Sequence, residues 1–145
     1  MTDTGPNDER TQARELAIKL LYVMDISGAA AAEAQSSELF VLEQVPRPAR
    51  ELALELFRGV RDNLAQTDKA LQEAAINWQL SRMPYLDRAI LRLGAYELMH
   101  QHDVPPRVTI NEAVELAKKY STEKSGAFVN GVLDKIFQTS CPEKV

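Results

Sequence analysis

Apolar residues recur at helical spacing along the first part of the chain. After a polar start at residues 1–9, which we expect to be a disordered leader, an apolar stripe predicts a first helix that ends near Gly28. The stripe consists of Ala13, Ala17, Leu20, Leu21 and Met24. Residues 29–45 are compatible with a short helix or with an extended buried segment. A long helix is then predicted from about Ala49 to Ala65, with Pro48 in its first turn.

The same periodicity continues beyond residue 66. Thr67 or Asp68 can cap a helix whose apolar face is formed by Leu71, Ala74, Ala75 and Trp78. The segment from about Asp87 to His100 is apolar around most of its circumference. Such a pattern is typical of a helix at the centre of a bundle, since only there is every side covered.

Capping patterns predict two further helices near the end of the chain. Thr109 and Glu112 have the spacing of a capping box, and Ser125 can cap the last helix. Residues 139–145 form a polar tail. We find no sustained alternation of apolar and polar residues of the kind that strands show. The predicted fold class is therefore all-α, with about seven helices in one domain of 145 residues.

Composition limits the classes of function. The net charge of −4 and the pI of about 5.2 do not suit a protein that binds nucleic acid through a bulk basic surface. Any RNA binding must use a local basic face. We see no signal peptide and no membrane span, and the single cysteine, Cys141, is consistent with a reducing cytosol. We therefore expect a cytoplasmic protein without a membrane association.

Enzymatic signatures are missing from the pattern. There is no glycine-rich phosphate loop, nucleophile elbow or zinc-protease motif. His100 and His102 do not share one helix face, so a metal site is not expected. Asp87 and Glu112 are explained as capping residues at helix starts. We expect no enzyme activity, no catalytic residues, no cofactor and no metal.

Basic residues provide the stronger hypothesis. Arg10 and Arg14 lie one helical turn apart, and Tyr22 lies two turns beyond Arg14. Arginines on one edge can contact phosphates, while an exposed aromatic ring can stack on an unpaired base. The alternative is a solvated helix face with a half-buried tyrosine. A second basic group consists of Lys118, Lys119 and Lys124, although cations at a helix C-terminus also complement the helix dipole.

Three motifs in a fixed order resemble the NusB family. They are L-D-R-A-I-L-R-L-G-A-Y-E-L from Leu86, V-T-I-N-E-A-V-E-L-A-K from Val108 and F-V-N-G-V-L-D from Phe128. The arginines near the start and Leu21-Tyr22 add to the resemblance, which covers essentially residues 10–137. It implies two packed helical sub-bundles, residues 10–66 and 67–138.

The resemblance also implies a function. NusB proteins are transcription antitermination factors that bind the single-stranded boxA element of ribosomal RNA leaders together with NusE, a small-subunit ribosomal protein, and help RNA polymerase read through terminators. Carried over, the RNA-binding residues would be Arg10, Arg14, Tyr22, Lys124 and Phe128, with Lys118 and Lys119 as the adjoining basic group. The NusE surface would involve the helix that begins at Asp87, including Arg88 and Leu91.

The chain departs from the family pattern in one place, and alternative interpretations remain. Thr11 and Gln12 stand between the arginines, where more arginines are common in the family, so RNA binding is expected to rely on the protein partner. Some members form homodimers, and the sequence leaves this possibility open. The competing interpretation is a helical protein–protein adaptor without a direct RNA role. A NusB-like domain also precedes some ribosomal-RNA methyltransferases, but we do not expect a cofactor-binding sheet here.

Overall fold

The computed structural model describes residues 6–141, of which the side chains are described from residue 9. In this range the regular structure consists of seven α-helices and one short 3-10 helix, and no strand occurs. The predicted all-α class is confirmed. The chain divides into two compact units, residues 1–61 and residues 62–145, whereas we had placed the boundary after residue 66. Among the described residues, none of the helices has the length and apolar character needed to cross a membrane.

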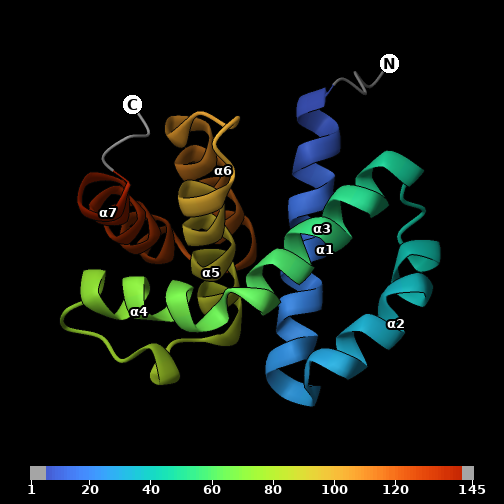
Figure 1. The fold of residues 1–145 in the computed structure, drawn as a ribbon, viewed down its shortest axis with the longest axis horizontal. Helices are drawn as coiled ribbons and strands as arrows, with labels where there is room; N and C mark the ends of the chain where they lie inside the picture. Colours follow the sequence, from blue (N-terminus) through green and yellow to red (C-terminus); the bar gives the residue numbers. More distant parts are fainter. Residues whose placement is uncertain (1–5, 142–145) are drawn as a thin grey trace. The chain divides into compact units, whose positions relative to one another are not determined.

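The first unit contains α1 (Pro6–Ser27), α2 (Ala29–Leu42) and α3, which spans Arg47–Asp62. Gly28 lies between α1 and α2 with a φ of +95°, a conformation that glycine adopts without steric cost, and its N–H donates to the Met24 carbonyl at 2.8 Å. The two helices open from this turn (Figure 1). The open choice for residues 29–45 is thus resolved in favour of a helix.

The predicted apolar stripe forms the core of the first unit. Met24, the fifth predicted member, is half-buried. The core residues of α1 and α3 that are at most 1% exposed are Ala13, Ala17, Leu20, Leu21, Ala49, Ala53, Leu56, Phe57 and Val60. Helix α2 adds Ala32 and Phe40. Helix α1 begins at Pro6, so the expected leader is wrong for residues 6–9, and residues 1–5 lie outside the described range.

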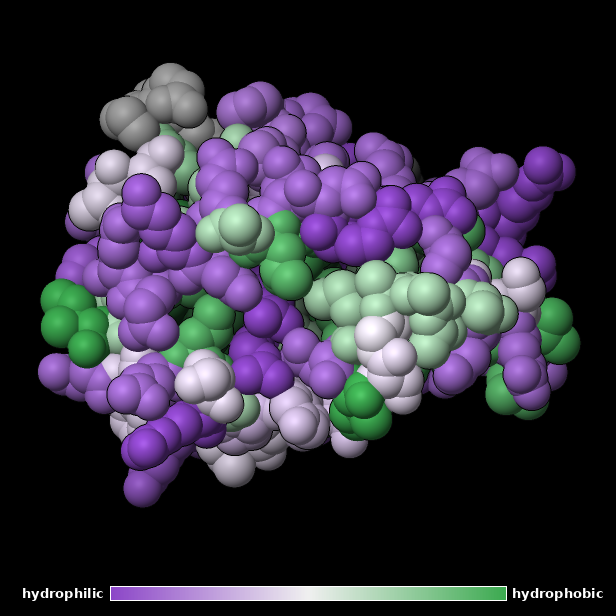
Figure 2. All heavy atoms as spheres, turned by 60° about the horizontal axis from the view of Figure 1, so that its bottom comes forward, coloured by the Kyte–Doolittle hydropathy of each residue, from purple (hydrophilic) through white to green (hydrophobic). Residues whose placement is uncertain are grey.

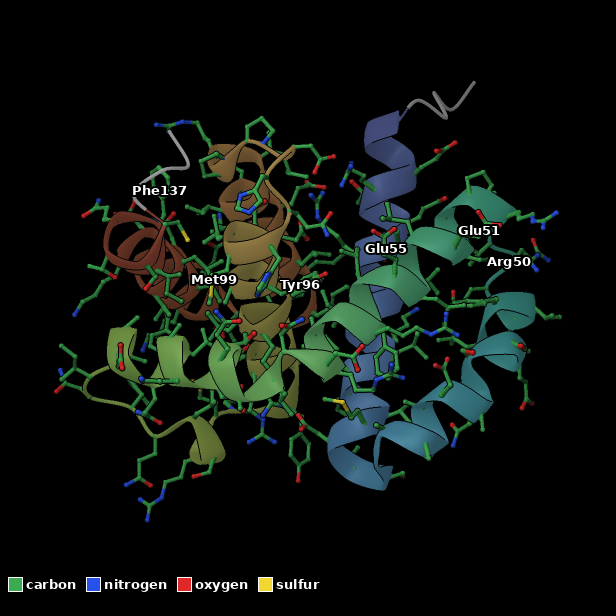
Figure 3. The ribbon with its side chains drawn as sticks, viewed as in Figure 1. Arg50, Glu51, Glu55, Tyr96, Met99 and Phe137 are labelled. Carbon is green, nitrogen blue, oxygen red and sulfur yellow. The ribbon has the colours of Figure 1, made fainter. Side chains whose placement is uncertain are left out.

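The second unit contains α4 (Leu64–Ala74), the 3-10 helix η1 (Leu80–Arg82), α5 (Tyr85–His100), α6 (Pro106–Tyr120) and α7 (Glu123–Ser140). Helix α5 contacts α4, α6 and α7, and every residue from Asp87 to Leu98 is buried. The prediction of a central helix is confirmed. Figure 3 labels Tyr96 and Met99 on α5 and Phe137 on α7.

Close packing holds α5 against α7. A Cβ atom added to Gly94 would lie 2.7 Å from Cδ1 of Leu133, which is closer than two carbon atoms can pack. Glycine at this position therefore permits the approach of the two helices. The expected tail is partly helical, because α7 continues to Ser140, and Cys141 is buried; residues 142–145 lie outside the described range.

The predicted N-caps of α4, α6 and α7 are all wrong. Thr67 and Asp68 lie inside α4, which begins a turn earlier, and the Thr67 hydroxyl donates to the Asn63 carbonyl at 2.9 Å. Thr109 lies inside α6, which begins at Pro106; its buried hydroxyl donates to Glu97 Oε1 at 3.3 Å. 

The last helix is capped by a different residue from the one predicted. The cap of α7 is Thr122, whose side chain accepts from the Ser125 N–H at 3.1 Å. Ser125 therefore lies in the first turn of α7, where its hydroxyl is available for a contact with another helix.

Candidate nucleic-acid interface

The predicted RNA-binding residues of α1 have unequal exposure. Arg10 is half-buried and Tyr22 is 38% exposed, whereas Arg14 is only 3% exposed. Arg14 shares the buried side of α1 with Ala13 and Ala17. The expected pair of phosphate-binding arginines therefore needs correction: Arg10 is accessible, but the guanidinium of Arg14 is not presented to solvent.

The predicted lysines lie around the junction of α6 and α7. Lys118 Nζ lies 3.9 Å from Glu115 Oε1 and 4.0 Å from Glu123 Oε2, and Lys119 Nζ lies 5.2 Å from the centre of the Tyr120 ring. Lys118, Lys119 and Lys124 are all exposed. Acidic neighbours offset the charge of Lys118, so Lys119 and Lys124 contribute more to a basic surface here.

A second glycine controls the geometry of this junction. A Cβ atom added to Gly126 would lie 2.9 Å from Cγ of Lys118. Because Gly126 has no side chain, the first turn of α7 approaches the end of α6 closely. The approach positions Ser125, whose hydroxyl donates to Asp87 Oδ2 on α5 at 3.0 Å.

A groove of about 310 Å³ lies beside this turn, within the second unit. Its aromatic wall consists of Trp78 and Phe128, with ring centres 5.5 Å apart and an interplanar angle of 64°. Arg82 and Lys124 provide cations, and Asp87 provides a carboxylate. Met83, Pro84 and Ser125 complete the lining. Aromatic rings beside cations are the chemistry that single-stranded nucleic acid needs.

The segment between α4 and α5 is held in place by one glutamine. Gln72 Nε2 donates to the Trp78 carbonyl at 2.7 Å, and Gln72 Oε1 accepts from the Leu80 N–H at 3.0 Å. Arg88 Nη1 donates to the Leu80 carbonyl at 3.2 Å. These bonds fix the backbone at the N-terminal end of η1, between Trp78 and Leu80, and thereby help to position Trp78 at the groove.

Sequence reasoning assigned Trp78 to an apolar helix face and did not single out Arg82. The structure corrects this assignment, because α4 ends at Ala74 and the Trp78 side chain is 60% exposed. The sequence signal for this non-helical segment was Met83-Pro84. A proline restricts the residue before it to an extended conformation, so the helical pattern is interrupted before α5. Phe128, which the family resemblance assigns to RNA binding, is half-buried and lines the groove.

The three residues predicted for the protein partner are mostly buried. Asp87, Arg88 and Leu91 are 7%, 9% and 0% exposed. Leu91 belongs to the core and offers no surface to a partner, which corrects that part of the prediction. The Arg88 guanidinium lies 5.0 Å from the centre of the Tyr85 ring, and Tyr85 itself is 46% exposed.

The face of the molecule drawn in Figure 2 is mainly hydrophilic. On the face drawn in Figure 2, hydrophobic residues form separate patches within a hydrophilic surround. Exposed large apolar side chains include Ile26, Val41, Leu42, Ile76, Trp78 and Val108. Leu42 lines a groove of the first unit that contains Lys19 and Glu38, whereas Trp78 lines the groove that contains two cations, Arg82 and Lys124.

The histidines do not form a metal site. Residues 9–141 contain no group of three or more His, Cys, Asp or Glu side chains suited to a metal ion. His100 Nε2 lies 3.1 Å from Gln66 Oε1, and its ring is 5.2 Å from that of Tyr96. Burial, followed by the nearby charge of His102, lowers the pKa of His100 below its ordinary value.

Comparison with known proteins agrees with these features. The NusB family model matches residues 11–138. The transcription antitermination protein NusB of Anaeromyxobacter dehalogenans is 46% identical over 127 residues, which cover 88% of this chain and 89% of that protein. Among solved structures, NusB of T. maritima is 36% identical with a TM-score of 0.79, covering 93% of this chain and 95% of the other.

A further similar structure contains antitermination factors NusB and NusE in complex with double-stranded RNA. Its matching chain is 29% identical with a TM-score of 0.80, and the match covers 90% of this chain and 97% of that one. The family model spans nearly the whole described range, and the curated relative is matched over most of its length. The chain belongs to the NusB family.

Proposed function

We propose that this chain is a transcription antitermination factor that binds boxA-type single-stranded RNA jointly with NusE and promotes read-through by RNA polymerase. Membership of the NusB family supports this function, as does the similar structure in which NusB and NusE hold RNA. The observation on this chain that carries the proposal is the groove that combines an aromatic wall with Arg82 and Lys124.

The groove suits RNA although the whole chain is acidic. The net charge of −4 gives no general attraction to phosphates. Arg82 and Lys124 concentrate positive charge beside the exposed ring of Trp78. Backbone phosphates would contact the cations, and bases would stack on the aromatic wall. Affinity for RNA without a partner should be modest because few cations take part.

Arg10 and Tyr22 extend this proposal to the first unit. Both have side-chain surface on α1 that RNA could reach. Arg10 would contact a phosphate, and Tyr22 would stack on a base. Arg14 is retained as a residue that supports α1 from its buried side, not as a direct contact.

The NusE surface is proposed at the start of α5. Asp87 and Leu91 offer little or no area, so the contact would use the exposed Tyr85 ring with the Arg88 guanidinium against it. An aromatic side chain supported by an arginine is typical of the residues that contribute most to protein interfaces. A basic ribosomal protein at this place would extend the positive surface along the RNA.

The test is RNA binding by variants that lose the groove cations. Arg82→Ala/Lys124→Ala should weaken binding of boxA RNA by the NusE complex at least tenfold and reduce the slope of log affinity against log salt. The matched control, Lys69→Ala/Arg107→Ala, removes the same charge from exposed positions of α4 and α6 outside the groove. Equal losses in both pairs would indicate only a net-charge effect. Absence of RNA binding by the parent complex would favour the adaptor interpretation.

A further inference from the structure

The carboxylate of Asp87 is the unusual group of the groove. Its side chain is buried, and Ser125 Oγ donates to Oδ2 at 3.0 Å. Oδ1 is also buried, and no donor among the described residues bonds to it. A buried acceptor without a donor costs free energy, so such groups are rare and often belong to functional sites. Asp87 also lines the groove, which places this carboxylate next to any group bound there.

The remaining lining restricts what that group can be. Trp78 and Phe128 meet edge to face and offer apolar surface to a flat ring. The volume of about 310 Å³ is at the small end of the range for ligand pockets, which suits a single planar group. Arg82 and Lys124 add positive charge for an anion attached to that group. A planar ring that has hydrogen-bond donors on one edge and carries a phosphate group fits the aromatic wall, the Asp87 acceptor and the two cations.

We propose that the groove binds one unpaired guanine of the RNA, with the Asp87 carboxylate as the acceptor for its Watson–Crick edge. This inference rests on the proposed RNA-binding function. It assigns base selection to a residue that sequence analysis had placed in the protein-partner surface. The base would stack on the aromatic wall while its 5′ or 3′ phosphate contacts Arg82 or Lys124.

Guanine is favoured because its Watson–Crick edge carries two neighbouring donors, N1–H and the N2 amino group. A carboxylate has two acceptor oxygens and no donor, so the two edges match. Adenine and cytosine each place an unprotonated ring nitrogen beside their amino group, which a carboxylate repels. Uracil has one N–H between two carbonyl oxygens. A site with a buried acceptor discriminates against a base that leaves the acceptor unpaired.

Ser125 and the soft torsion of Asp87 make this binding possible. The Ser125 hydroxyl occupies one lone pair of Oδ2 and leaves another for the base. Oδ1 has essentially no solvent-exposed surface, so it reaches the base by rotation about χ2. This torsion has a broad energy profile in aspartate, so the rotation itself costs little, but it also moves Oδ2 relative to the Ser125 hydroxyl, and the hydrogen bonds to the base must offset that change. The base would give Oδ1 the donor that the chain itself does not supply.

The experiment uses the full chain with NusE and a labelled single-stranded RNA that contains one guanine. Versions of this RNA carry inosine or adenine at that position, and binding is measured by fluorescence anisotropy. The parent should bind the adenine RNA at least tenfold more weakly than the guanine RNA. Inosine keeps N1–H but lacks the amino group, so its loss should be intermediate.

Asp87→Asn tests the residue itself. An asparagine offers one acceptor and one donor, which match the N1 and amino group of adenine. The variant should lose at least tenfold on the guanine RNA, and its preference should move toward the adenine RNA. Asp134→Asn is the matched control, because it removes the same charge from an exposed position on α7 outside the groove and should keep the guanine preference. Thermal melting of both variants ensures that the folded protein is compared.

The outcomes separate this inference from the function on which it rests. RNA binding that is equal for guanine, inosine and adenine would overturn the guanine site and leave RNA binding intact. An unchanged guanine preference in Asp87→Asn would overturn the role of Asp87. Loss of NusE binding in Asp87→Asn, with the base preference retained, would assign the carboxylate to the protein partner instead. If no RNA binds at all, the proposed function and the guanine site both fail.

Discussion

The two units of this chain use charged residues in different ways. In the first unit, Glu33 on α2 accepts hydrogen bonds from Arg58 and Arg61 on α3, and all three side chains remain partly exposed. In the second unit, Arg92 on α5 is buried and forms a bidentate pair with Asp68 on α4. Charges that are removed from water must be paired, whereas exposed ones need not be. Breaking the Arg92–Asp68 pair of the second unit should therefore cost more than breaking the partly exposed cluster around Glu33 in the first unit.

The pairing of buried charges in the second unit also helps to explain the unpaired carboxylate oxygen of Asp87. The buried charge of Arg92 has two hydrogen bonds from its guanidinium to one carboxylate, while the buried carboxylate of Asp87 has one oxygen without a donor among the described residues. Among the described side chains of this unit, no other buried polar atom lacks a partner, so an unpaired oxygen beside a groove is better explained by binding than by stability.

The largest effect on stability is expected for Leu93→Ala. Leu93 is 2% exposed on the central helix α5, so the truncation should leave a cavity and lower the free energy of unfolding by about 2–5 kcal/mol. Urea denaturation measures the change. Leu42→Ala is the control from the first unit, because Leu42 is 74% exposed and its loss should cost less than about 0.5 kcal/mol. Similar costs for both would contradict the assignment of α5 as the core helix.

Arg92→Ala should have the next largest effect. The substitution leaves Asp68 without its bidentate partner, and the free energy of unfolding should fall by about 2–4 kcal/mol. Arg47→Ala breaks an exposed pair with Glu51, for which about 0.5 kcal/mol or less is expected. Figure 3 labels Glu51 on α3. The contrast between the units would disappear if the two variants were equally stable in the same denaturant series.

Thr109 distinguishes a buried hydrogen bond from a helix cap. Thr109→Val keeps the shape of the side chain but removes the hydroxyl that donates to the buried Glu97, so it should cost about 1–3 kcal/mol. Thr122→Ala removes the actual cap of α7 and should cost about 1 kcal/mol. Thr109→Ser retains the donor and should be the mildest of the three. A Thr109→Val protein as stable as the parent would show that the contact with Glu97 does not stabilise the fold.

The smallest effect concerns the pH dependence of the first unit. The hydrogen bond from Arg58 is the main cause that lowers the pKa of Glu33. A carboxyl whose pKa is lowered by folding stabilises the protein above its unfolded pKa of about 4.3, and this stabilisation is lost as the pH falls through the lower folded value. Glu33→Gln should reduce the loss in the free energy of unfolding at acidic pH by less than about 1 kcal/mol, because the pair is partly exposed. An unchanged profile would indicate that the pair contributes nothing.

The sequence was sufficient to predict the fold, but it did not locate the groove. Hydrophobic periodicity identified the helices, and the encircling apolar pattern identified α5 as central. The hydroxyl of Thr109 was misread because a capping threonine and a buried threonine have the same local pattern, and only the start of α6 at Pro106 separates them. Spacing placed Arg14 on the same side as Arg10, but it did not show that this position is buried.

The groove could not be predicted because its parts are distant in sequence. Trp78 precedes α5, whereas Lys124 and Phe128 belong to α7. Their meeting depends on the bonds of Gln72 around η1 and on the close approach that Gly126 allows. Neither effect has a periodic signature in the chain. The basic pattern and the family resemblance both indicated Lys124, the resemblance indicated Phe128, and the structure adds Trp78 and Arg82 beside them.

Cooperation between this chain and NusE in RNA binding can be measured by calorimetry. Calorimetry gives the affinity of the chain for NusE, and titrations with boxA RNA give the affinities of the chain alone, of NusE alone and of the complex. We expect the complex to bind RNA at least tenfold more tightly than either protein, which corresponds to about 1.4 kcal/mol of coupling. Affinities for RNA that are equal with and without NusE would contradict the account.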